Sequence, residues 1–207
     1  MIEKTFFSLK NQTQYFYQTN PERLMMSLLE FDVTVDSYSP FEFKMVSTRS
    51  FNEIETAPGF TAIRAGAKEF IVLSDRLAAN RTLTNVVKAE MQRSEPAPIH
   101  LTVHRPGDIE HQVLAKNVAF LYQYAIDTPS ANDVHAVKDY FSYVTDSSIA
   151  RLKRFLQSDH AIYHLLFHYG LRADLSFETL TEDTIVTVGP LISSVLKGLG
   201  QAVEVRQ

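Results

Sequence analysis

The chain has 207 residues, of which 45% are hydrophobic and 21% are charged, and its formal net charge is −4 at pH 7. Such values are typical of a globular protein and exclude global disorder. The negative balance gives the whole molecule no counterion-release drive toward nucleic acid. No cysteine is present, which excludes disulfides, thiolate catalysis and cysteine-ligated zinc or iron–sulfur sites.

The first residues contain no positive region followed by an apolar core, so we expect no signal peptide. No apolar run approaches the roughly 20 residues that a membrane-spanning helix needs. We therefore expect a cytoplasmic or particle-associated protein that does not bind a membrane.

The first clear signals lie between residues 20 and 47. Asn20 followed by Pro21 and an acidic residue predicts the start of a helix. Residues 32–47 then alternate like a β-hairpin with a turn at 37–40. One predicted face is apolar and consists of Val33, Val35, Phe41, Phe43 and Met45. The other face is polar and consists of Asp32, Thr34, Asp36, Glu42 and Lys44.

The middle of the chain is expected to mix strands and helices. Residues 50–59 read as a loop, and residues 61–64 and 69–73 as a pair of strands. A helix capped by Ser74 should reach Arg93, followed by a strand at 99–105 and a turn at 106–108. Residues 113–126 fit a strand or a helix, and their aromatic and β-branched second half favours a strand.

From residue 129 onward the pattern becomes helical. Helix starts are predicted at Ser130, at Ser147 or Ser148, and near Asp159. A strand at 184–188 precedes a last helix after Gly189-Pro190, and residues 203–206 fit a terminal strand. The prediction is one α+β domain spanning 1–207, with a soft boundary near 128–130. Its N-terminal part is rich in antiparallel strands and packs with a helix-rich C-terminal part.

The polar face of the predicted hairpin carries the one candidate catalytic set. Asp32 or Asp36, followed by Glu42 and Lys44, resembles the core of the PD-(D/E)xK nucleases. The resemblance implies that the carboxylates would hold Mg²⁺ and that the lysine would steady the attacking water or the phosphate. The same alternation is typical of the solvated face of an ordinary sheet, which we expect here.

Three histidines, His160, His164 and His168, recur every four residues on one predicted helix. Such spacing lets two of them share a metal ion, for instance His160 and His164, but residues 160 and 168 are about 12 Å apart along a helix axis. We expect an outer polar face at this position. A pH-sensitive surface and a metal site are the alternatives.

No nucleophile elbow and no phosphate-binding glycine loop occurs in the sequence, so we expect no nucleotide or organic cofactor. Aromatic residues are plentiful, with fourteen Phe and nine Tyr, and tyrosine is favoured in interfaces. The sequence therefore favours a non-catalytic interaction or assembly protein that self-associates or binds a protein partner. It would be a subunit of a complex or of a viral or phage particle. The alternative is a Mg²⁺-dependent nuclease or phosphoesterase, which alone would bind nucleic acid.

Overall fold

The structure is a computed structural model that describes residues 4–46 and 54–192. The chain divides into two compact units, residues 1–112 and 113–207. This division lies before the soft boundary expected near 128–130, because residues 113–121 form a helix of the second unit. Whether the two units unfold together as one domain stays a prediction.

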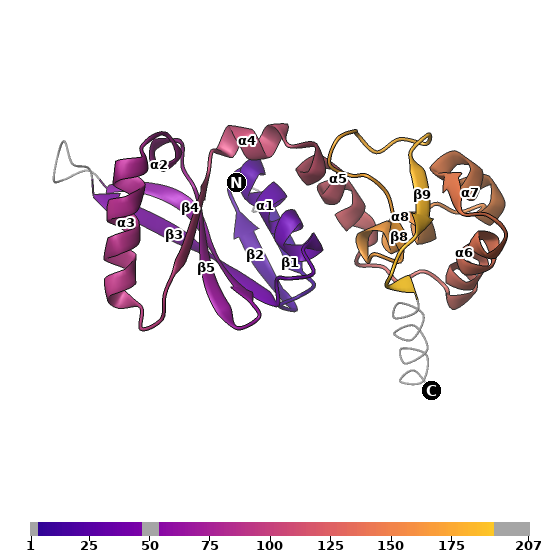
Figure 1. Ribbon diagram of the computed structural model, residues 1–207, viewed down its shortest axis with the longest axis horizontal. Coiled ribbons are helices and arrows are strands. Elements are labelled where there is room, and N and C mark those ends of the chain that lie inside the picture. Colours follow the sequence, from indigo (N-terminus) through magenta and orange to yellow (C-terminus); the bar gives the residue numbers. More distant parts are fainter. Residues whose placement is uncertain (1–3, 47–53, 193–207) are drawn as a thin grey trace. The chain divides into compact units, whose positions relative to one another are not determined.

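In its described residues, the first unit combines a small hairpin, a four-stranded sheet and four helices (Figure 1). The sheet has the order β3-β4-β5-β6; its first three strands are antiparallel, and β6 runs parallel to β5. Its elements are β1 (Lys4–Ser8), β2 (Thr13–Tyr17), α1 (Asn20–Phe31), β3 (Ser37–Val46), β4 (Ile54–Arg64), β5 (Ala67–Leu73), α2 (Asp75–Ala79), α3 (Arg81–Ser94), β6 (His100–His104) and α4 (Pro106–His111).

The prediction of a hairpin within residues 32–47 is wrong for its first strand. Residues 33–36 form a turn and irregular backbone, in which the Val35 N–H donates to the Asp32 carbonyl at 3.0 Å. The Lys10 ammonium donates to the carbonyls of the same two residues, at 2.5 Å each. These local bonds satisfy backbone groups that a strand would have used in a ladder. The single strand β3 instead runs through the expected turn and pairs with β4.

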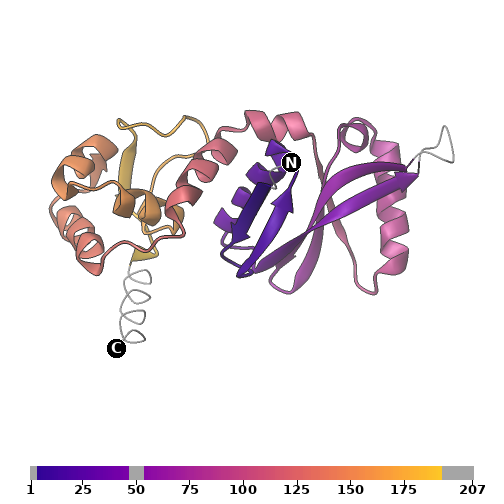
Figure 2. The same ribbon diagram turned by 180° about the vertical axis from the view of Figure 1, so that it is seen from behind.

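The alternation of β3 itself is confirmed. Met45 is buried, with Phe41 and Phe43 packed against the same cluster, and this face of the sheet meets Leu83 and Val87 of α3. The opposite face is covered at one end by α1 and by the β1–β2 hairpin, so that part of the sheet lies between two layers (Figures 1 and 2).

Several predicted boundaries in this unit need correction. Thr19, rather than Asn20, precedes α1, and the Glu22 carboxylate accepts from its backbone N–H at 3.0 Å. The expected loop at 50–59 is strand from Ile54 onward. The expected turn at 106–108 is the start of α4, because Pro106 fits the first turn of a helix.

The single helix expected after Ser74 is two helices. Ser74 caps α2 as predicted, accepting from the Leu77 N–H at 3.3 Å. Asn80 then interrupts the helix and caps α3, since its side chain accepts from the Leu83 N–H at 3.0 Å. An asparagine whose side chain competes with the helix backbone favours such a restart.

The second unit is mainly helical, with a small antiparallel sheet of order β7-β9-β8. Ser130 and Ser148 cap helices α6 and α7 as predicted, and the strand expected at 184–188 is present. The elements are α5 (Val113–Leu121), the 3₁₀ helix η1 (Tyr122–Tyr124), α6 (Ala131–Tyr143), β7 (Asp146–Ser148), α7 (Ile149–Leu156), α8 (His160–Phe167), β8 (Leu171–Arg172) and β9 (Ile185–Val188).

The strand favoured for residues 113–126 is wrong. Ala115, Val118, Ala119 and Leu121 are buried, and their spacing of three and four residues is that of a helix. Packing of this stripe decides against the β propensity of the aromatic residues that follow it.

The fold class is α+β, with antiparallel strands concentrated in the first unit and helices toward the C-terminus. In the part of the chain that the structure describes, no helix is long and apolar enough to cross a membrane. Most of the last predicted helix, with Val195 and Leu199, and the terminal strand at 203–206 lie outside the described residues.

Candidate functional site

Asp32 and Asp36 lie in the segment that connects α1 to β3. Both carboxylate oxygens of Asp32 are engaged: one accepts from the Thr34 N–H and hydroxyl at 2.9 and 2.8 Å, and the other lies 2.5 Å from Arg64 Nη1. Burial alone would raise the pKa of Asp32, but the hydrogen bonds from Arg64 and Thr34 outweigh it and lower the pKa. The Asp36 side chain is exposed.

Glu42 and Lys44 lie together elsewhere on β3, where they form an ion pair of 3.3 Å with side chains 58% and 63% exposed. Arg64, the partner of Asp32, lies at the end of β4 that pairs with Ser37. Glu42 is five residues farther along β3, about 17 Å at the rise of a strand. Ligands of one Mg²⁺ lie about 2.1 Å from the ion, so Asp32 and Glu42 are not brought together.

The described residues contain no group of three or more His, Asp or Glu side chains that could hold a metal ion. The predicted Mg²⁺ set is therefore split between a turn and an exposed strand. Glu42 and Lys44 have the exposure of the solvated face that we expected.

A buried polar cluster, which the sequence did not single out as a site, joins α1 to the strands around it. Glu30 is only 5% exposed. Its carboxylate accepts from the Ser8 hydroxyl at 2.5 Å, from the Lys10 N–H at 3.1 Å and from the Tyr38 hydroxyl at 2.8 Å. Hydrogen bonds to a charged acceptor are stronger than neutral ones. Glu30 thus fixes the β1–β2 loop against α1 and β3.

The charges beside this cluster are also used internally. Burial lowers the pKa of Lys10, although the charges of Glu30 and Asp32 oppose the shift. Arg64 connects Asp32 to Glu69, whose carboxylate lies 2.8 Å from Arg64 Nε and accepts from the Thr102 hydroxyl at 2.7 Å. These groups hold the start of β3 to the ends of β4 and β5 and to β6, and their arrangement is that of structural ion pairs.

The outer polar face predicted for the three histidines is wrong. His164 is 6% exposed, and all residues of α8 from Ala161 to Phe167 are buried. A helix that is apolar on nearly all sides is enclosed by its surroundings. The three imidazoles face the segment after α5, so that each bonds a carbonyl there: His160 to Asp127 at 2.8 Å, His164 to Tyr124 at 3.0 Å and His168 to Ala125 at 3.2 Å.

These bonds define which ring nitrogens carry hydrogen. A carbonyl only accepts, so the hydrogen lies on Nε2 of His160, Nδ1 of His164 and Nε2 of His168. The His164 and His168 rings are 4.3 Å apart between centroids. Burial first, and then the neighbouring His168, lower the pKa of His164 to about 4. A metal site formed by His160 and His164 alone stays a prediction.

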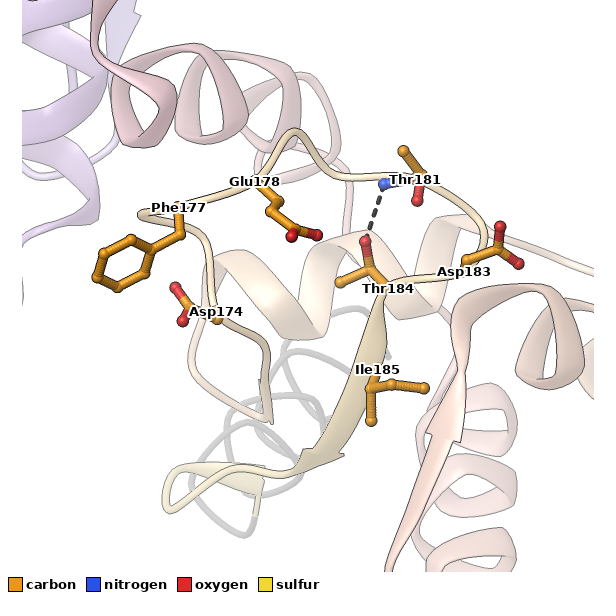
Figure 3. A pocket seen from close by; sticks show the side chains of 7 residues that line it. All are labelled: Asp174, Phe177, Glu178, Thr181, Asp183, Thr184 and Ile185. Carbon is orange, nitrogen blue, oxygen red and sulfur yellow. Dashed lines mark hydrogen bonds between the residues drawn. The ribbon is translucent and has the colours of Figure 1, made fainter.

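A surface pocket of about 310 Å³ lies in the second unit, at the loop between β8 and β9. Figure 3 shows the bond across this loop, in which the Thr181 N–H donates to the Thr184 hydroxyl at 2.9 Å. Phe177 is 82% exposed. The pocket lining is mixed, with three carboxylates, two threonines and two large apolar side chains, from Asp174, Phe177, Glu178, Thr181, Asp183, Thr184 and Ile185.

The loop between β8 and β9 that lines this pocket is anchored by Asn117 of α5, which is 2% exposed. Its Nδ2 donates to the carbonyls of Leu175 and Glu178 at 2.9 and 2.8 Å, and its Oδ1 accepts from the Leu180 N–H at 2.9 Å. One buried amide thus fixes both arms of the loop. Phe177 is therefore presented by an anchored backbone.

The first unit has a larger groove, of about 580 Å³, between β2, the start of α1 and the middle of β3 and β4. Phe16 lines this groove with 62% of its surface exposed. Pro40, Glu42 and Pro58 also line it.

No known protein family model matches the sequence, and no curated protein matches it. The site must therefore be read from the geometry of this chain.

Two of the groups described here were missed by sequence reasoning. Asn117 and Glu30 each lie within an apolar helical stretch. A polar residue on a buried stripe indicates a hydrogen-bonded group, because a buried polar side chain requires a bonded partner. Phe177 has no such signal, since exposure of a single aromatic residue in a loop depends on the tertiary fold.

Proposed function

We propose that this chain is a non-catalytic interaction or assembly protein, a subunit of a multi-protein complex or of a viral or phage particle, that acts in the cytoplasm or within the particle. The observation that carries the proposal is the exposure of large aromatic side chains at both surface hollows. Phe177 is 82% exposed at the pocket of the second unit, and Phe16 is 62% exposed at the groove of the first.

Burying one such side chain in an interface contributes about 1.5–3 kcal/mol. A partner can fill a hollow and pack against the aromatic side chain beside it. An aromatic side chain on a flat surface offers less shape complementarity. In the second unit Tyr143 and Phe155 add further exposed aromatic surface, 88% and 53% exposed. These side chains are suited to contacts with another protein.

The interior of the described part supports the same proposal. Across residues 4–46 and 54–192, no buried side-chain nitrogen or oxygen lacks a hydrogen-bond partner. Charged residues such as Glu30 and Arg64 bond to the fold itself. This pattern supports recognition through the surface, where the aromatic residues lie.

The test is capture of partners by the full chain from its native source, with quantitative mass spectrometry of what is retained. We expect Phe177→Ser or Phe16→Ser to reduce retention of the partner at least about tenfold, the effect of losing roughly 1.4 kcal/mol. Val86→Ser is the matched control, because Val86 is 59% exposed on α3 and lines neither hollow.

Retention that is equal for wild type and both Phe variants would contradict the role of these residues. A chain that stays monomeric in light scattering at high concentration and retains no partner at all would contradict the proposed function.

A further inference from the structure

Among the described residues, strand β3 is an edge of the four-stranded sheet, with β4 on one side only. The direction of its backbone groups follows from Tyr38. The Asn11 side chain donates to the Tyr38 carbonyl at 2.8 Å and accepts from the Tyr38 N–H at 3.3 Å. Tyr38 therefore turns its N–H and carbonyl away from β4. Because this direction alternates along a strand, Pro40, Glu42 and Lys44 also turn theirs outward.

The two prolines of this strand pair agree with that assignment. Pro40 of β3 lies opposite Phe60, and Pro58 of β4 lies opposite Glu42. A proline lacks an N–H, so it is tolerated where the backbone faces away from the neighbouring strand. Pro40 faces away from β4, and Pro58 faces away from β3 at a position just before the first paired residue of β4 and β5.

Within residues 4–46 and 54–192, the outward edge is covered only near its start. Asn11 and the Tyr15 hydroxyl bond to Tyr38. Beyond Pro40, no described residue is bonded to the outward backbone groups of Glu42 and Lys44. An open edge with unpaired N–H and carbonyl groups is a template for another strand.

We propose that β3 pairs antiparallel with β3 of a second copy of this chain, in the register that places Phe43 opposite Phe43. This inference rests on the proposed function and names one partner of the protein. The register places Glu42 of each copy opposite Lys44 of the other, so two pairs of opposite charges lie across the junction. Directly opposite charges stabilise a strand pair, whereas like charges destabilise it.

Neighbouring registers do not have this complementarity. Outward-facing residues must meet outward-facing residues, and a shift of the centre of symmetry by one residue places it on Glu42 or Lys44. Either shift places two identical charges face to face. Of these three registers, only the one centred on Phe43 places Glu42 opposite Lys44.

The paired segment is short, so the dimer is expected to be weak and concentration-dependent, as for other small interfaces. Sedimentation equilibrium of the full chain over a range of concentrations is the primary measurement. We expect Glu42→Lys alone, and Lys44→Glu alone, to weaken the dimer about tenfold or more, because each variant replaces both opposite-charge pairs by like-charge pairs.

An equimolar mixture of the two variants is the decisive sample. In the mixed pair every lysine again faces a glutamate, so we expect dimerisation to return to the wild-type level. Glu90→Lys and Lys88→Glu, which make the same charge changes on the exposed surface of α3, are the matched controls and should leave the dimer unchanged.

The register has an independent test because the chain contains no cysteine. Under mild oxidation, Glu42→Cys mixed with Lys44→Cys should cross-link between the two variants faster than either variant cross-links with itself. Residues directly opposite in the proposed ladder have Cα atoms about 5.5 Å apart, within the range of a disulfide.

A wild-type chain that stays monomeric, or variants whose mixture does not recover the dimer, would overturn the inference. Partner capture that persists and still depends on Phe16 or Phe177 would, in that case, leave the proposed function standing. Loss of partner capture in the Glu42→Lys variant without recovery in the mixture would assign the edge to a strand of another protein.

Discussion

His164 is a histidine whose burial and neighbouring imidazoles oppose a proton more strongly than its carbonyl hydrogen bonds favour one. It lies between His160 and His168 on α8, and its donated hydrogen bond goes to the Tyr124 carbonyl. Burial and the neighbouring imidazoles lower its pKa from 6.5 to about 4. The folded chain therefore holds His164 neutral at pH values where the unfolded chain would protonate it.

The sign of the pH dependence follows from linkage. A group whose folded pKa is lowered costs stability as the pH falls from the unfolded pKa toward the folded one, because the unfolded chain binds the proton first. We expect His164 to remove roughly 2.5 kcal/mol from the free energy of unfolding between about pH 7.5 and 4.5. Urea denaturation followed by circular dichroism at several pH values measures this loss.

The variant for this test is His164→Gln, whose amide can still donate to the Tyr124 carbonyl but cannot titrate. Its stability should fall less steeply than that of wild type over the same pH range. His135→Gln, at an exposed position of α6, is the control and should follow wild type. Parallel curves for wild type and His164→Gln would contradict the assignment.

Local sequence signals identified several residue roles correctly. Ser74, Ser130 and Ser148 were predicted as caps because each precedes an apolar helical stripe, and a cap depends on residues within one turn. The burial of His164 could not be predicted in the same way. It depends on carbonyls of residues 124–127, which only the tertiary fold brings opposite α8.

At the scale of elements, the β4–β5 hairpin contains an unfavourable turn residue. Its two-residue turn consists of Ala65 and Gly66, with φ values of 47° and 79°. Both residues lie in the left-handed region, which is typical of a type I′ turn and suits Asn-Gly. Alanine in this region costs about 1–2 kcal/mol because its Cβ approaches the following carbonyl.

We expect Ala65→Asn to raise the free energy of unfolding by about 0.5–1 kcal/mol, since asparagine tolerates this conformation. Thermal denaturation and urea denaturation measure the change. Ala67→Asn is the matched control, because Ala67 is also exposed but lies in β5, where asparagine is disfavoured. Equal or lower stability for Ala65→Asn than for Ala67→Asn would contradict the turn assignment.

The sequence predicts an element well where its hydrophobic residues follow one clear period. It predicts an element poorly where hydrogen bonds to a distant side chain replace the hydrogen-bond ladder of a strand. The alternation of Phe41, Phe43 and Met45 identified the inner face of β3 correctly. Residues 32–36 had the same alternation, but Lys10 holds their carbonyls in a turn. Lys10 lies in the loop between β1 and β2, more than twenty residues away in sequence. No local sequence pattern could therefore indicate this contact.

At the scale of the whole molecule, each of the two units contains buried apolar residues of its own. Phe60 is 1% exposed in the first unit, and Leu165 is fully buried in the second. Replacing a buried leucine by alanine typically costs 2–5 kcal/mol. Such a variant therefore shows whether the chain opens as one domain or as two.

We expect Leu165→Ala to increase hydrogen exchange in residues 113–192 and to leave the exchange of β3, β4 and β5 unchanged. Mass spectrometry of peptides from both units measures the effect. The reciprocal variant, Phe60→Ala, should act on the first unit alone. Faster exchange in both units for either variant would instead confirm the single domain predicted from the sequence.

The candidate site was predictable only in part. Glu42 and Lys44 were recognised as a pair on one face, because two-residue spacing fixes that relation. Their distance from Asp32 was not predictable, since it depends on where the chain turns. Phe16 and Phe177 belong to hollows that form only when β2 meets α1, and when Asn117 anchors the loop before β9.

The far edge of the four-stranded sheet, β6, limits how far strand pairing can propagate. It has only five residues, His100–His104, and Pro98 and Pro106 flank it. Short edge strands bounded by prolines resist the addition of further strands. A sheet that joins two copies through β3 would end in β6 on both sides. Growth would therefore stop at a closed pair, and concentrated solutions of the chain should not form fibres.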